Sequence, residues 1–175
     1  MALIGDSMVT QWADWIGERI NTSRTISRPL VERELRLIVS ALNNMVGPFR
    51  REVKPVWART CEHYGRVGAA RGLAAGDVVE EFQFLRSVLT RNLAPVLITM
   101  RARRAMAIIL RLNMVLDGGI ASAVVGYTDA LVATLFAQNG VPAAEADLDA
   151  SDIERQIAAL EVELARVVKQ DGPKE

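Results

Sequence analysis

The sequence predicts an all-α protein, and three observations point to that fold class. Apolar residues recur at spacings of three and four along almost the whole chain, which is the period of an amphipathic helix. Segments with the alternating pattern of strands, bounded by Gly and Asn turns, are missing. Half of the 175 residues are apolar, so the chain can build a sizeable core. We expect a helical domain over residues 1–140, an acidic linker over 141–150 and a separate C-terminal helix over 151–175.

The first three helices are expected in the N-terminal part of the chain. The periodic apolar pattern predicts one from Ser7 to Ile20, followed by a polar loop. Proline is well suited to the first turn of a helix, where its missing N–H is not needed, so Pro29 is expected to open a second helix that ends near Gly47. Pro55 is expected to start or kink a third.

Four glycines follow, and they predict both a helix-to-helix connection and close packing. Gly65 and Gly68 loosen the backbone and allow helices to approach, while the residues from Gly72 to Gly76 are expected to form the turn between two helices. Asp77 then lies in the first turn of the next helix, where a carboxylate interacts well with the helix dipole.

Two long apolar segments follow Pro95, "VLITMRARRAMAIILRLNMVLDGG" and "IASAVVGYTDALVATLFAQNG". We expect them to be two helices that form the centre of the bundle. The longest uncharged stretch, Ala130 to Ala144, contains Gly140 and Pro142 and is too short and broken to span a bilayer. No membrane insertion is therefore expected.

The last helix carries an apolar seam. Ser151 and Glu154 have the spacing of a capping box at its start. The seam residues recur at spacings of 4, 3, 4 and 3, the pattern of a coiled coil: Ile153, Ile157, Leu160, Leu164 and Val167. We expect these five residues to face their counterparts in a parallel homodimer. Because the seam lasts only about two heptads, packing against the bundle is the alternative.

Few residues offer chemistry, because the chain has a single His and a single Cys. His63 and Cys61 supply too few ligands for a closed zinc site, and residues two apart on a helix diverge too far to act as a nucleophile and its base. We interpret His63 as a packing or capping residue and expect no bound cofactor. The alternative is a ligand-binding sensor that holds haem, another tetrapyrrole or an apolar small molecule, with His63 as a ligand.

Charge excludes other functions. The 21 basic and 21 acidic residues cancel, so a general attraction to nucleic acid is not expected. The cluster Arg101, Arg103, Arg104 and Arg111 could bind an anion, but without interleaved aromatic residues a solvated helix face is preferred. Because no set of residues has the spacing of a catalytic site, we expect a protein that is not an enzyme. One cysteine rules out an internal disulfide, and with no signal peptide in view this favours the cytoplasm.

Two stretches together resemble a known family. The stretch "YGRVGAARGLAAGDVVEEFQFLR", with Glu81, Phe82, Leu85 and Arg86, and the later "LNMVLDGGIASAVVGYTDAL" are similar to the N-terminal sensor domains of stressosome RsbR-type proteins and related sensor histidine kinases. The resemblance covers roughly Met8 to Phe136.

The resemblance implies a haem-free, globin-like helical bundle that forms a homodimer and senses a signal without catalysis. It also implies an output module, such as a STAS domain or a kinase, connected through a C-terminal helix. No such module follows the helix that ends near Lys169, so the chain is expected to be a fragment of a longer protein or a domain that acts on its partner in trans.

Overall fold

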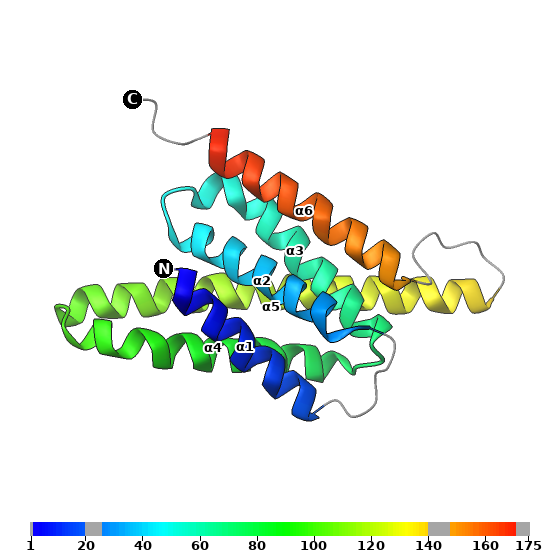
Figure 1. Ribbon diagram of the computed structural model, residues 1–175, viewed down its shortest axis with the longest axis horizontal. Coiled ribbons are helices and arrows are strands. Elements are labelled where there is room, and N and C mark those ends of the chain that lie inside the picture. The colour runs from blue at the N-terminus through cyan, green and yellow to red at the C-terminus, as the bar shows by residue number, and fades with distance from the viewer. Residues whose placement is uncertain (1, 20–25, 140–147, 171–175) are drawn as a thin grey trace.

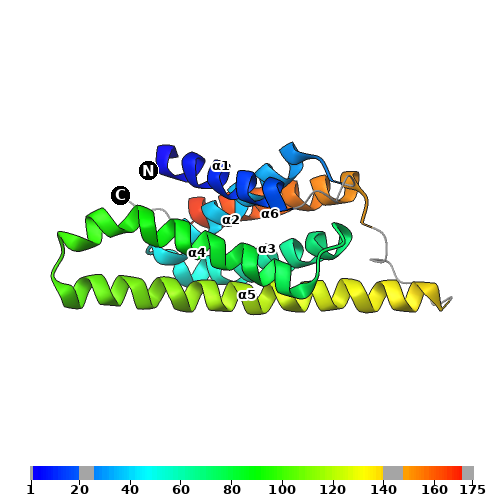
Figure 2. The same ribbon diagram turned by 90° about the horizontal axis from the view of Figure 1, so that it is seen from below.

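The computed structural model describes residues 2–19, 26–139 and 148–170, and within these ranges the prediction of an all-α fold is confirmed. No strand occurs in the described residues. They form six helices (Figure 1): α1 (Ala2–Arg19), α2 (Arg28–Val46), α3 (Arg50–Ala70), α4 (Ala75–Ile98), α5 (Ala102–Gln138) and α6 (Ala150–Gln170). Helices α4 and α5 run side by side as one long pair, and the shorter helices lie on one side of α5 (Figure 2).

Some predicted boundaries agree closely with the structure. Helix α2 has Pro29 in its first turn and ends at Val46, as predicted. Helix α1 begins earlier than expected, at Ala2 rather than Ser7. Helix α3 begins at Arg50, so Pro55 lies inside it and does not start it.

The two apolar segments after Pro95 are not two helices. From Ala102 onward they form the single helix α5, which has 37 residues and is therefore about 55 Å long. The expected break at Gly118 and Gly119 does not occur, because Gly119 lies against another helix: a Cβ atom there would lie 2.5 Å from Cζ2 of Trp57. Glycine at this position serves close packing, and neighbouring contacts keep it helical.

Helices α3 and α5 touch through their backbones. A Cβ atom on Gly65 would lie 1.8 Å from the carbonyl oxygen of Ala123, and one on Gly126 would lie 2.0 Å from the carbonyl oxygen of Glu62. Neither glycine can carry a side chain unless the helices separate. The prediction that Gly65 serves close packing is confirmed, but it lies within α3 and does not loosen the backbone there.

The turn between α3 and α4 lies where the sequence placed it. Gly72 has a φ of 75°, a conformation that favours glycine. Asp77 accepts a hydrogen bond from the backbone N–H of Ala74 (2.9 Å), which caps α4. The hydroxyl of Tyr127 donates to the carbonyl oxygen of Leu73 (2.9 Å), so α5 holds the turn in place.

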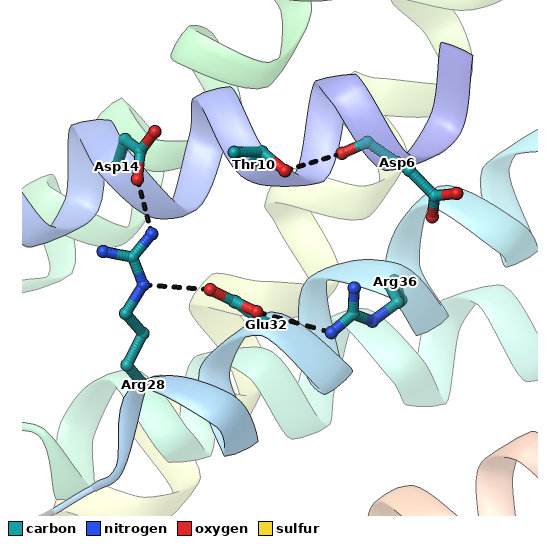
Figure 3. Close-up of polar contacts among 6 residues, drawn as sticks. All are labelled: Asp6, Thr10, Asp14, Arg28, Glu32 and Arg36. Atoms are coloured by element: carbon teal, nitrogen blue, oxygen red, sulfur yellow. Dashed lines mark hydrogen bonds and ion pairs between the residues drawn. The ribbon is translucent and has the colours of Figure 1, made fainter. Parts of the chain in front are cut away.

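An aromatic cluster and a chain of ion pairs fix α1. The rings of Trp12, Tyr64 and Phe82, from α1, α3 and α4, lie with centroids 5.4 to 6.1 Å apart in the core. At the surface Arg28 reaches from α2 to Asp14 on α1 (2.5 Å) and also bonds Glu32 (Figure 3). Because the side chains of Arg28 and Asp14 are exposed, their ion pair orients α1 but stabilises it little. The aromatic rings supply most of the stabilisation.

The apolar seam of α6 packs against its own chain, where the sequence had predicted that it faces a second copy. It lies along α3 and beside α2 (Figure 1). Ile153, Ile157 and Leu164 are buried, and Leu160 and Val167 are partly buried against the same core. The alternative from the sequence, packing against the bundle, is the one observed.

The start of α6 differs from the prediction as well. Asp149 caps the helix by accepting a hydrogen bond from the N–H of Asp152 (2.7 Å), where the sequence had suggested a capping box of Ser151 and Glu154. Residues 140–147, which include most of the predicted linker, lie outside the described residues. The described part of the C-terminal segment is thus one of the layers of the bundle.

Candidate functional site

A buried polar cluster lies where α2, α3 and α4 meet, and it contains the only histidine. Glu34 from α2 and His63 from α3 form a contact of 2.7 Å between Oε1 and Nδ1. Both side chains are buried, with His63 only 3% exposed. A buried carboxylate needs a partner, so this pair ties α2 to α3.

A second pair in the cluster ties the end of α3 to α4. Arg71, which follows the last residue of α3, donates to both carboxylate oxygens of Glu81, at 2.7 and 3.2 Å. The hydroxyl of Tyr64 donates to the same carboxylate at 2.5 Å. Glu81 therefore accepts from two residues of the α3 segment, which satisfies its charge in a buried position.

The cluster shifts the acidity of two of its members. Burial raises the pKa of Tyr64 well above 10, and the neighbouring Glu81 raises it further. For Arg71 burial favours the neutral form, but Tyr64 and Glu81 outweigh it and the pKa of Arg71 is raised overall. Both residues therefore keep their ordinary charge states, neutral for Tyr64 and positive for Arg71.

Cys61 lies one residue before Glu62 on α3 and is fully buried. Burial raises the pKa of its thiol well above 9, and Glu62 adds to the effect. The thiolate is the nucleophilic form of cysteine, so burial works against reactivity here. This environment is that of a packing residue.

The position of His63 can be compared with the two roles considered from the sequence. It is buried and hydrogen-bonded as a packing residue would be, but it does not end its helix, since α3 continues to Ala70. Its second ring nitrogen, Nε2, is buried and has no hydrogen-bond partner among the described residues. A search of these residues found no group of three or more His, Cys, Asp and Glu side chains that could hold a metal ion.

The arginine cluster at the start of α5 is divided by the structure. Arg101, Arg103 and Arg104 surround a shallow hollow at the turn between α4 and α5, where all three side chains are exposed. Arg111 lies two turns further along α5 and does not contribute to that hollow. The four arginines therefore do not converge on one anion site.

The buried pairing of Glu34 was not predicted from the sequence, and Glu81 was named there only among the residues of the family resemblance. The sequence does carry a sign of both burials, because each glutamate lies on the apolar face of its helix. Glu34 lies four residues before Ile38 on the buried face of α2, and Glu81 lies four residues before Leu85 on the buried face of α4. A carboxylate on an apolar stripe predicts a buried partner.

The second unusual feature of the molecule is the outward face of α5. Large apolar side chains are exposed there, including Met114 (66%) and Val125 (52%). By length and composition α5 could cross a membrane: a stretch of 18 residues has a mean hydropathy of 1.7, and only 28% of it is buried. The uncharged stretch from Ala130 to Ala144 overlaps only the last nine residues of this helix, from Ala130 to Gln138. An exposed apolar surface of this length marks an interaction site.

Comparisons with protein-family models, with curated proteins and with solved structures found no match to this chain.

Proposed function

We propose that this chain is a non-catalytic sensor domain that passes a signal through α6 to an output module. In this proposal the bundle is a cytoplasmic, globin-like domain of a bacterial stress or two-component signalling protein, and the module is a STAS domain or a kinase, in cis or in trans. The observation that carries the proposal is the position of α6 on the two helices that hold the buried pair of Glu34 and His63.

Charged residues next to that pair hold α6 at its rim. Arg33, the neighbour of Glu34, donates to both oxygens of Glu161 at 2.6 and 3.0 Å. Arg59, one turn before His63, pairs with Glu163. Any rearrangement of the buried pair that shifts α2 against α3 must therefore also shift the surface on which α6 lies.

The attachment of α6 is suited to a switch. Its apolar seam is buried, but its edges are held by partly exposed ion pairs, each of which contributes about 0–1 kcal/mol. An element held by a narrow contact can move without unfolding the rest of the bundle. A signal that changes the core can thus reach a module attached to α6.

Hydrogen exchange tests the coupling between the core and α6. Glu34→Gln removes the charge from the buried pair and should speed amide exchange across α6. The matched control is Tyr64→Phe, which removes the hydroxyl bond between α3 and Glu81 on α4. It should affect α4 more than α6. Equal exchange of α6 in the parent chain and in Glu34→Gln would contradict the coupling.

The transfer of a signal is tested by fusing a histidine-kinase core to α6 in a continuous helix. Arg59→Glu places two carboxylates together and should loosen α6, changing autophosphorylation several-fold. Arg91→Glu alters an exposed residue on α4, away from α6, and serves as the control. Kinase activity that responds to neither variant would reject the relay through α6.

A further inference from the structure

The outward face of α5 is the least explained surface of the molecule. Helix α5 forms one edge of the bundle, and the described helices all lie on its other side (Figure 2). At 3.6 residues per turn, six residues of small or apolar type share this outward face: Leu110, Met114, Gly118, Ala121, Val125 and Val132.

The four central residues of the face, Met114, Gly118, Ala121 and Val125, are placed symmetrically about one point of the helix. Met114 and Val125 lie at equal distances from the point midway between Gly118 and Ala121, and they are the large side chains nearest to it on this face. Two copies placed antiparallel would therefore set each Met114 against the Val125 of the other copy. We propose that α5 pairs with α5 of a second copy of this chain in this antiparallel arrangement.

Small residues at the centre allow the two helices to approach closely. A Cβ atom on Gly118 would meet nothing within 4 Å, so this glycine is not required by packing within its own chain. Glycine in an open helix position lowers helix stability relative to alanine by about 0.5–1 kcal/mol. A close contact with another helix gives the residue a role that the single chain does not.

Charges on one flank of the face match the same geometry. Arg111 and Asp129 lie nine residues before and nine residues after residue 120, on the same side of the helix. Neither forms an ion pair within the described part of the chain. In an antiparallel pair with twofold symmetry, flanks of the same side meet, so Arg111 of each copy lies beside Asp129 of the other.

The remaining acidic residue near the face does not oppose the pairing. Asp117 is bonded to Arg86 of its own chain, which compensates its charge.

The outward face of α5 is also large enough for an interface between two copies. A face about 55 Å long and about 10 Å wide on each copy buries roughly 1,000 Å² in total, near the lower limit for a specific interface. A lipid surface would gain nothing from the matched charges, which favours a second copy as the occupant.

This inference goes beyond the relay through α6 and does not depend on it. Sedimentation equilibrium of the whole chain should show a dimer, and Gly118→Leu should convert it to a monomer that keeps the helix content of the parent by circular dichroism. Gly118→Ala, the conservative control, should remain dimeric. Normal exchange of α6 in the Gly118→Leu monomer would show that only the α5 contact is lost.

The antiparallel geometry has its own test in two charge variants. Arg111→Glu and Asp129→Arg should each weaken dimerisation about tenfold or more, because each places like charges together twice. An equimolar mixture of the two variants should restore the dimer, since both cross-chain pairs are then opposite in sign. A mixture that associates no better than either variant alone would overturn the arrangement. A monomeric parent that floats with phosphatidylcholine vesicles would overturn it in favour of lipid.

Discussion

Single glycines serve three different purposes in this chain, and their surroundings decide which. Gly72 supplies a positive φ in the turn between α3 and α4. Gly65 and Gly126 leave room for the backbone of another helix. Gly118 has open space around it, and the third purpose, close approach of a second copy, is the one proposed above. The sequence shows the residue type in each case, but only contacts distinguish the purposes.

Gly72 tests the first purpose. Gly72→Val should lower the free energy of unfolding by about 1–2 kcal/mol, because a β-branched residue is strained at a φ of 75°. Gly72→Asn should cost less, since asparagine tolerates this conformation. No side chain would clash here, because a Cβ atom meets nothing within 4 Å. Urea denaturation of the three proteins measures the difference. Equal stability of all three would show that the positive φ at residue 72 does not require glycine.

Tyr64 gives the molecule a defined response to alkaline pH. The folded state holds the pKa of Tyr64 well above 10, while in the unfolded chain the phenol ionises near 10. Its contribution to stability is complete below about pH 10 and is lost as the pH rises toward the folded pKa. Tyr64→Phe should be less stable than the parent at pH 8, and this difference in the free energy of unfolding should narrow as the pH rises above about 10. Urea denaturation at each pH measures it; a constant gap would show that the phenol titrates alike in both states.

At the scale of helices, features set by neighbouring residues could be predicted from the sequence, whereas features set by contacts with distant helices could not. The start of α2 and the turn at Gly72 follow from residues at those positions, and both were predicted. The continuity of α5 and the packing of α6 depend on surfaces far away in the chain. Gly119 remains helical because Trp57 covers it, and Ile157 is buried because α2 and α3 offer an apolar surface. The same limit applies to the buried cluster, whose partners come from three helices.

Two adjacent glycines in α5 test how far such contacts determine stability. Within the single chain, Gly118→Ala should stabilise α5 by about 0.5–1 kcal/mol, because no other part of the chain lies near the new Cβ atom and alanine favours a helix. Gly119→Ala should destabilise it, since the new Cβ atom would meet Trp57 at 2.5 Å and Sγ of Cys61 at 3.1 Å. Thermal unfolding of both variants gives the comparison. A similar melting temperature for the two would show that α5 and α3 separate easily.

At the scale of the whole molecule, two surfaces account for how the chain could assemble. The seam of α6 is used within the chain, and the outward face of α5 remains available to a second copy. A coiled coil through α6 would expose the surface of α2 and α3 that α6 covers, so the same residues cannot serve both contacts at once. Self-association through α5 leaves α6 in place and free to respond to the core.

The intramolecular role of α6 predicts how its variants depend on protein concentration. Ile157→Ala should lower the free energy of unfolding by about 2–5 kcal/mol, because it leaves a cavity where a buried side chain had been. The matched control is Val162→Ala on the same helix, which alters a side chain that is 70% exposed and should change stability by less than about 0.5 kcal/mol. Since the contact of Ile157 lies within one chain, its cost should be equal at low and high protein concentration. Urea denaturation over a wide range of protein concentrations measures this loss of unfolding free energy. If the loss grew as the protein was diluted, the seam would lie in an interface between copies instead.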